Sequence, residues 1–494
     1  MESFLSAVLG ELMTRSINFI ISKCSKPPAL VVEESLQRAL LRAQVIIEEA
    51  MGRHITNQSM IHQLDMLRDA MHQGYYALDA FRYQPYYVEE DGKDQAVNYF
   101  ISVSKVPSPM EPYFSGQTAR FLQQLREALD RLSSMIVDLN ELVMFLMSYP
   151  RLYRQPYSMH IILGNCMFDR QMEAELIIKF LLHTKPHSSE ELEVLPLVGP
   201  FRVGKSTLIA HVCKNERVRD YFSEILWLHD CDFTDGELTF RQGCATKHQN
   251  HLSNLKKGKR LLVVIELYDN LCEDAWNRFY VASKRSFLSG SKIIVTSCSD
   301  MIVKFGTTPA LTLKYLSPEA YWYFFKTLTF GSMDPEMHPR LAQLAMEIAR
   351  LQHRSINSAY IISCLLKDNF SIHFWCKVLS FMRGFIQTYV SKFGVHPFDL
   401  LNQNKPVQLR RMAAPSEDFM ICHQYHRSTE EEVPEIRIQD VMYGSIKKQG
   451  KFEVLVWRSQ IPPYYSYVNV CEIRERKITG AKRKHWMKDG PTFC

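Results

Sequence analysis

The sequence predicts a multidomain protein with an α-helical bundle first, then an α/β domain built on a parallel sheet, and then a small helical domain followed by a short irregular or β-strand tail. Three observations predict this order. Apolar residues recur at helical spacing over residues 1–150, short apolar runs then alternate with helical stretches, and the helical period returns near residue 317. At about 100–200 residues per domain, a chain of 494 residues has room for two to four domains.

The first predicted domain, residues 1–150, is expected to be a four-helix bundle. Leu5, Leu9 and Leu12 lie at helical spacing, and the pair Pro27-Pro28 ends this first stretch because proline breaks the hydrogen bonding of a helix. Residues 84–114, rich in proline, tyrosine and charge, are expected to form a long loop, and residues 151–166 a linker. The four helices are predicted within residues 2–26, 31–51, 57–83 and 118–147.

Residues 167–312 are predicted to form the α/β domain, because four apolar runs of strand length are separated by helical stretches. This alternation is typical of a parallel sheet that helices cover on both faces. A helical domain is expected over 313–395 and an irregular tail over 396–494. The predicted strands are 194–198, 225–228, 261–265 and 292–296 in the sheet and 435–441, 452–457 and 465–473 in the tail; the later helices are 318–330, 335–351, 355–366 and 372–393.

The charge is concentrated at one end of the chain. The whole sequence has 59 Lys and Arg against 53 Asp and Glu, a net charge of +6, whereas residues 447–494 hold eleven basic and four acidic residues, a local charge of +7. The rest of the chain is therefore close to neutral, and composition gives no strong indication of nucleic-acid or membrane binding. A hydrophobic content of 46% excludes a disordered protein.

The twelve cysteines are spaced singly, with no C-x-x-C pair, which is typical of a reducing compartment. The start of the chain lacks the features of a signal peptide, and no apolar run approaches the roughly 18–20 residues that span a bilayer. We therefore expect a cytoplasmic protein, and leave open a peripheral membrane or a nuclear pool.

The strongest chemical signal is the sequence from Gly199 to Thr207, GPFRVGKST, which matches the phosphate-binding pattern G-x-x-x-x-G-K-[ST]. It lies between a predicted strand and a predicted helix. In such a loop, backbone N–H groups and the helix N-terminus face phosphate oxygens. Lys205 supplies a positive charge for the β- and γ-phosphates, and the Ser206 hydroxyl can bind Mg²⁺. The sequence therefore predicts a nucleotide site here.

A second element of such sites is an apolar strand that ends in an acid. The run Leu261-Leu262-Val263-Val264-Ile265-Glu266 fits, about sixty residues after the loop. Glu266, at the carboxyl end of the strand, is the candidate acid for Mg²⁺ or its waters, and Asp269 is the alternative. No catalytic residue beyond this candidate is assigned.

Several blocks, in order along residues 1–395, resemble plant disease-resistance proteins of the coiled-coil type, which have an Rx-type N-terminal bundle and an NB-ARC nucleotide-binding module. The resemblance identifies a member of this family without leucine-rich repeats. The blocks are the acidic third-helix motif around Leu67-Arg68-Asp69-Ala70 and Leu78-Asp79, the opening motif Phe168-Asp169-Arg170-Gln171, the phosphate-binding loop, the aromatic block from Tyr221 to Trp227, GSKIIVTS at 290–297, and LTLKYLSPEA at 311–320.

The resemblance implies binding of ADP or ATP with Mg²⁺, and a nucleotide-dependent switch or adaptor in plant defence. It implies that protein partners bind through the helical bundle, and it leaves a homo-oligomer open. Ser206 and Glu266 would hold the Mg²⁺ ion. The residues expected to bind nucleotide are Arg170, Gly199, Arg202, Val203, Gly204, Lys205, Ser206 and Thr207.

Two departures from the family pattern bear on hydrolysis. Leu267 follows Glu266 where the family has a second Asp, and Cys298 stands where the family has an arginine. We therefore expect little hydrolysis, at most that of a weak ATPase. Two alternatives stay open: a P-loop ATPase or kinase-type enzyme with its substrate site in 313–394, and a degenerate adaptor or decoy that binds no nucleotide.

Overall fold

The computed structural model describes residues 29–53, 55, 57–83, 115–151, 168–183, 192–229, 260–267, 272–403, 405–414, 416–427, 432–448, 450–458 and 466–475. The expected first helix, the long loop 84–114, nearly all of the linker and the basic cluster Lys482-Arg483-Lys484 lie outside these residues. The chain divides into two compact units, residues 1–382 with 459–465, and residues 383–458 with 466–494.

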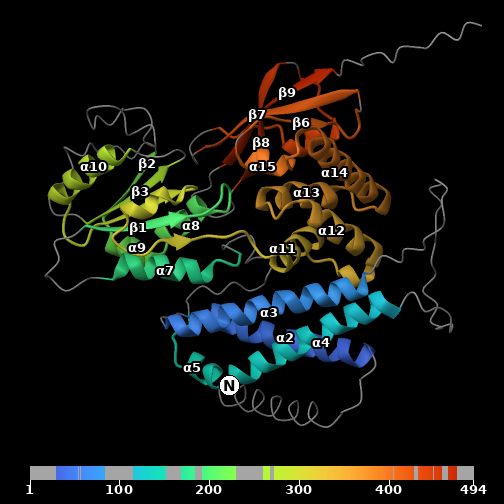
Figure 1. Ribbon diagram of the computed structural model, residues 1–494, viewed down its shortest axis with the longest axis horizontal. Helices are drawn as coiled ribbons and strands as arrows, with labels where there is room; N and C mark the ends of the chain where they lie inside the picture. The colour runs from blue at the N-terminus through green and yellow to red at the C-terminus, as the bar shows by residue number, and fades with distance from the viewer. Residues whose placement is uncertain are drawn as a thin grey trace, which may run out of the picture. The chain divides into compact units, whose positions relative to one another are not determined.

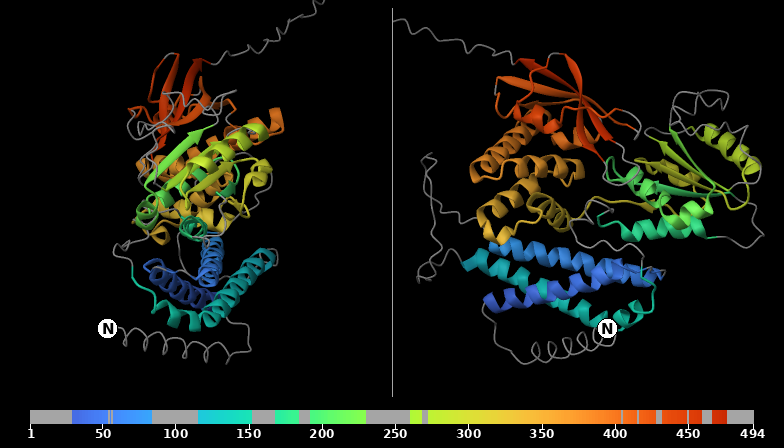
Figure 2. Two further views of the ribbon diagram at one scale, coloured as in Figure 1. Left: turned by 90° about the vertical axis from the view of Figure 1, so that its left-hand side faces the viewer. Right: turned by 180° about the vertical axis from the view of Figure 1, so that it is seen from behind.

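The first unit begins with a helical region in which α2 (Ala29–Met51), α3 (Gln58–Arg82) and α4 (Ser115–Asp138) lie side by side (Figures 1 and 2). Two of the predicted helices, 31–51 and 57–83, are confirmed by α2 and α3. Asn57 caps α3, and its side chain accepts hydrogen bonds from the backbone N–H groups of Ser59 and Met60. The helices share one apolar core, whose most buried members include Leu36, Leu40, Leu67, Met71, Leu125 and Leu132.

The predicted single helix over 118–147 is wrong, because the helix is divided at Leu139 into α4 and α5 (Asn140–Leu146). The ψ angle of Leu139 is −1°, far from the helical value near −42°. Asp138 precedes this residue, and an aspartate side chain competes with the helical backbone for hydrogen bonds and favours helix ends. The described residues thus contain three of the four expected helices, the last of them divided, and because the expected first helix lies outside them the four-helix bundle is not confirmed.

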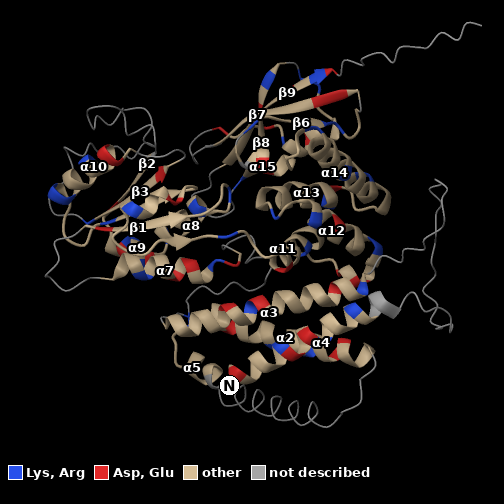
Figure 3. Ribbon diagram, viewed as in Figure 1, with Lys and Arg blue, Asp and Glu red and all other residues tan. Residues whose placement is uncertain are grey.

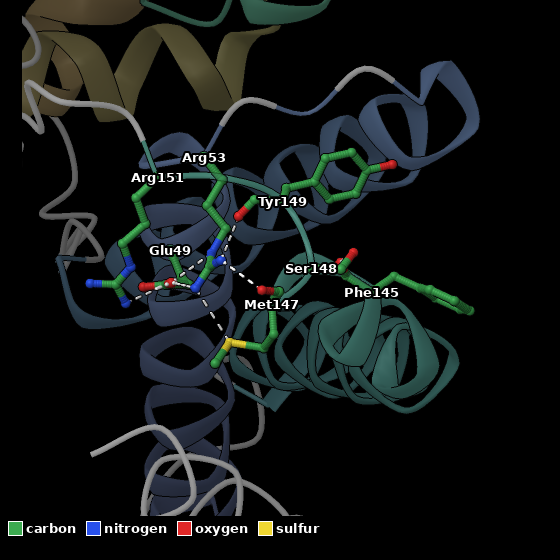
Figure 4. Close-up of polar contacts among 7 residues, drawn as sticks. All are labelled: Glu49, Arg53, Phe145, Met147, Ser148, Tyr149 and Arg151. Carbon is green, nitrogen blue, oxygen red and sulfur yellow. Dashed lines mark hydrogen bonds and ion pairs between the residues drawn. The ribbon is translucent and has the colours of Figure 1, made fainter.

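Arg53 joins the end of α2 to the end of α5 (Figure 4). Its guanidinium donates to the carbonyl oxygens of Met147 at 3.1 Å and Tyr149 at 2.8 Å, and pairs with Glu49. Both carbonyls lie just after Leu146, the last residue of α5, so the helix supplies no donor for them, and Arg53 provides one in a partly buried place. Arg151, more exposed, also contacts Glu49.

A five-stranded parallel sheet follows, which confirms the predicted α/β domain class. Alternate side chains of each buried strand enter two different apolar cores, as the two-residue period of a strand requires. Its strands, in spatial order, are β2 (Glu224–His229), β3 (Leu261–Leu267), β4 (Lys292–Ser297), β1 (Glu193–Val198) and β5 (Leu311–Thr312).

Helices cover both faces of this sheet (Figure 1). One face packs against α7 (Gln171–Leu182), α8 (Lys205–Cys213) and α9 (Glu216–Tyr221). The other packs against α10 (Glu273–Ser286) and the 3₁₀ helix η3 (Asp300–Phe305).

The chain then returns to helix, as predicted. Ser317 caps α11 through a 3.1 Å hydrogen bond from the N–H of Ala320, and Pro318 occupies the first turn. The predicted helix 335–351 is divided at His338, because a residue that precedes proline avoids the helical conformation. The elements are α11 (Pro318–Phe330), η4 (Pro335–Met337), α12 (Pro339–Leu351), α13 (Ile356–Asp368) and α14 (Ile372–Phe393).

The second unit contains a four-stranded antiparallel sheet in the region where we expected an irregular or β-strand tail with three strands. Strands predicted over 452–457 and 465–473 are confirmed, but the strand predicted over 435–441 is wrong, because a helix forms there and Gly444, with φ of 111°, ends it. The sheet also contains two strands that we did not predict. The elements are α15 (Pro397–Asn402), α16 (Ile438–Tyr443) and, in spatial order, β6 (Val407–Arg410), β7 (Glu417–Arg427), β9 (Ser466–Glu475) and β8 (Lys451–Arg458).

Acidic and basic residues are interspersed along the described helices of the helical region (Figure 3). Among the helices that the structure describes, we find none with the length and apolar character needed to cross a membrane.

Candidate nucleotide-binding site

The candidate site lies at the carboxyl end of β1, where the loop 199–204 leads into α8. The loop starts with a 3.3 Å hydrogen bond from the N–H of Gly199 to the carbonyl of Ser297 at the end of β4. Its end is closed by a 2.9 Å bond from the N–H of Leu208 to the carbonyl of Gly204. The N-terminus of α8 therefore faces the loop, and this is where a helix attracts an anion.

Both motif glycines are required by the loop backbone. A Cβ on Gly199 would lie 2.7 Å from the carbonyl oxygen of Leu313, which is too close for any other residue. Gly204 has φ of 99°, in the left-handed region that favours glycine. Arg202 also has a positive φ, of 60°, and its guanidinium lies 5.5 Å from the ring of Phe201. Val203 anchors the loop in the core, with 1% of its surface exposed.

The Lys205 side chain turns into the loop. Its Nζ donates to the carbonyl oxygens of Gly199 at 2.6 Å and Pro200 at 2.9 Å, and lies 3.4 Å from Cys298 Sγ. Burial lowers the pKa of Lys205, an effect that the neighbouring Cys298 and Glu266 oppose. Lys205 is therefore a half-buried cation that donates to two neutral carbonyl oxygens. A phosphate anion bound in the loop would supply the negative charge that pairs with it.

Glu266 lies where the sequence predicts the acid. It is 5% exposed near the end of β3, in register with Thr296 on β4, and it acts electrostatically on Lys205. The next residue, Leu267, packs into the apolar core on the α10 side of the sheet. This strand therefore presents one acid to the site and not two.

Ser206 and Thr207 occupy the first turn of α8, and both are half-buried. Together with Lys205 and Glu266, Ser206 provides the residue types that bind a nucleotide phosphate and its Mg²⁺. These four residues and the loop glycines are the predicted site residues that the fold brings together.

Arg170 is buried beside the site but bonds elsewhere. Its guanidinium pairs with Glu173 at 2.9 Å and donates to the carbonyl oxygen of Lys314. Lys314 belongs to the segment 311–316, which also contacts the phosphate-binding loop. Arg170 therefore contacts this segment through Lys314. Neither of its two bonds joins the Arg170 guanidinium to the phosphate-binding loop.

Tyr315, which contacts the loop, and Arg354, which contacts Tyr315, were not predicted. The Tyr315 hydroxyl donates to the carbonyl oxygen of Phe201 at 3.2 Å. The Arg354 guanidinium lies 5.8 Å from the Tyr315 ring and donates to the carbonyl oxygen of Leu316. Arg354 has a positive φ of 59°, as does His353 before it, at 52°. The aromatic in LTLKYLSPEA is the sequence signal that could have indicated Tyr315.

Comparison with curated proteins identifies relatives among plant disease resistance proteins. The chain is 27% identical over 199 residues to the putative disease resistance protein RGA1 and 26% identical over 198 residues to the disease resistance protein RGA2, both of Solanum bulbocastanum. Each match covers 37% of this chain and 20% of the relative. The putative disease resistance RPP13-like protein 1 of Arabidopsis thaliana is 23% identical over 350 residues, which cover 64% of this chain and 31% of that protein.

The chain thus matches between a fifth and a third of the length of these relatives. No protein-family model matches it. Among solved structures, the Drosophila ORC bound to DNA matches 45% of this chain and 62% of its own, with 14% identity and a TM-score of 0.21, which is too low to establish a common fold.

Proposed function

Since this chain is a relative of plant disease resistance proteins, we propose that it acts in plant defence as a nucleotide-dependent switch or adaptor that hydrolyses ATP little. The observation that carries the proposal is the phosphate-binding loop, with Lys205 at the N-terminus of α8 and Glu266 on a neighbouring strand. ADP or ATP binds there, and Mg²⁺ is held by Ser206, Glu266 and the phosphates.

The segment 311–316 links the nucleotide to the helical parts of the chain. Tyr315 contacts the loop at Phe201, and α11 begins two residues after Leu316. Helix α11 in turn contacts α3, where Asp79 accepts a hydrogen bond from Trp322. A γ-phosphate that displaces Tyr315 would shift α11, so ADP and ATP would favour different contacts between α3 and α11.

Little hydrolysis follows from the side chains around the phosphates. Leu267 is buried where a second acid would orient water, and Cys298, which lies 3.4 Å from Lys205 Nζ, carries no fixed positive charge. ATP turnover should therefore be well below about 1 s⁻¹, the lower end for ordinary enzymes. A Lys205-dependent turnover near that value would favour the alternative of a P-loop ATPase.

Protein partners are proposed to bind the helical region. Its described surface exposes large apolar side chains of the kind that protein interfaces cover, among them Leu41, Val45, Met144 and Phe145. We propose that nucleotide exchange controls access to such partners or to a second copy of the chain.

Hydrogen exchange of the full chain tests the switch. A non-hydrolysable ATP analogue should speed amide exchange in α3 and α11 relative to ADP, and Lys205→Ala should abolish the difference. Equal exchange in the two nucleotide states, with both nucleotides bound, would contradict the switch. A chain that binds neither nucleotide would favour the adaptor or decoy alternative.

A further inference from the structure

Three side chains of metal-binding type meet where α3 contacts the turn that precedes α7. Asp69 and His72 belong to α3, and Asp169 belongs to the turn. One ligand atom from each residue lies within 4.8 Å of the other two. Asp69 and His72 are three residues apart and therefore share one face of the helix.

The turn presents Asp169 to this helix face. Asp169 has φ of 57°, a left-handed conformation that aspartate tolerates better than most residues. Its carboxylate meets α3, where Arg68 Nε lies 2.5 Å from Oδ1. A carboxylate has about four lone-pair sites, so Asp169 can contact Arg68 and a metal ion together.

His72 provides a second, independent observation. Its side chain is 1% exposed, and within the described residues Nδ1 has no hydrogen-bond partner. The ring packs against Phe168 at 5.5 Å and Tyr323 at 5.1 Å, which restricts its position. Buried polar atoms are normally satisfied, so this nitrogen indicates a missing ligand.

The charge around these residues favours a cation. The guanidinium of Arg68 pairs with Asp65 and with Asp169, and Asp69 lies next to Arg68 in the sequence. Three carboxylates and one guanidinium give these four groups a formal charge of −2.

We propose that Asp69, His72 and Asp169 bind one divalent ion of the zinc class, with water in the fourth position. One imidazole and two carboxylates suit Zn²⁺, whereas Mg²⁺ and Ca²⁺ prefer oxygen ligands throughout. Zinc bonds of about 2.0 Å place ligand atoms about 3.3 Å apart in a tetrahedron. The three ligand atoms lie within 4.8 Å of one another, so they must approach more closely to bind zinc. Asp69 is exposed, and its side chain can rotate toward the other two ligands. The ion would tie α3 to the turn before α7, separately from the nucleotide site.

Zinc titration of the full-length chain against a chromophoric chelator tests the site. The wild type should bind one equivalent through this site, and Asp69→Asn and His72→Gln should each weaken that binding at least tenfold. The matched control is His62→Gln, on the same helix but outside the three ligands and the charged groups around them, and it should bind zinc like the wild type. Asp69→Asn changes an exposed position, so its fold should persist, which circular dichroism checks.

X-ray absorption of the zinc-loaded chain separates this site from adventitious binding by the seventeen histidines and twelve cysteines. Nitrogen and oxygen neighbours near 2.0 Å, without sulfur near 2.3 Å, are expected. The proposal is overturned if Asp69→Asn binds zinc as tightly as the wild type, if no equivalent binds, or if sulfur dominates the coordination shell.

Discussion

Trp322 Nε1 donates a 2.8 Å hydrogen bond to the Asp79 carboxylate, which joins α11 to α3 across 243 residues of sequence. Lys326, one turn further along α11, pairs with the same carboxylate, and Asp79 is 3% exposed. A buried carboxylate that binds one indole and one ammonium is a fixed contact between the helical region and the helix that follows the sheet.

Loss of the Asp79 carboxylate should therefore loosen this contact. Asp79→Ala leaves Lys326 partly buried without its partner, and we expect a loss of about 3 kcal/mol of stability in the contact between α3 and α11. Hydrogen exchange in these helices measures the change. Asp79→Asn, which can still accept from Trp322, should lose less, and Asp138→Ala on the exposed face of α4 should stay within about 0.5 kcal/mol of the wild type. If α3 and α11 of Asp79→Ala are as protected from hydrogen exchange as in the wild type, the Asp79 contact contributes nothing to their stability.

Arg53→Ala should destabilise the helical region by about 2 kcal/mol, because the carbonyls of Met147 and Tyr149 lose a donor in a buried place. Arg151→Ala is the matched control, since Arg151 contacts the same Glu49 but is exposed, and it should cost less than about 1 kcal/mol. Urea unfolding followed by circular dichroism compares the two variants. If both lose the same stability, the bonds to the carbonyls are not the cause.

Tyr315→Phe should weaken ADP binding about fivefold, since it removes one hydrogen bond, worth about 1 kcal/mol, to the phosphate-binding loop. Titration with a fluorescent ADP analogue measures the affinity. Tyr280→Phe is matched, because Tyr280 donates to the carbonyl of Leu192 at the other end of β1, and its ADP affinity should equal that of the wild type. If both variants lose the same ADP affinity, the loss comes from a change in β1 and not from the hydrogen bond between Tyr315 and the loop.

The sequence predicts the loop well because its determinants are local. Gly199, Gly204 and Lys205 act within a few residues of one another, and the α/β alternation places Glu266 at the same end of the sheet. By contrast, the bond between Trp322 and Asp79 depends on packing of distant segments, which no local pattern encodes. The strands β6 and β7 were missed for a related reason, since half-polar antiparallel strands give a weak signal outside their sheet.

Bound Mg-ADP should protect Cys298 from alkylation at least about threefold, because its sulfur lies against Lys205 and the nucleotide would cover both. Cys364 is the control, exposed on α13 and away from the loop, and its labelling should not change.

Cys213 should stay unlabelled even at pH 9, since burial raises its pKa to about 12 and keeps it a thiol. Mass spectrometry of the labelled peptides over time gives the rates. Equal Cys298 rates with and without bound Mg-ADP would remove Cys298 from the nucleotide site.

The central claim is that the loop from Gly199 to Thr207 holds a nucleotide through Lys205. Chromatography of the small molecules released when the purified chain is denatured tests this most directly. The account predicts close to one ADP or ATP per wild-type chain and almost none from Lys205→Ala folded to the same extent. Wild type without nucleotide, even after incubation with Mg-ADP, or equal amounts from both proteins, would contradict it.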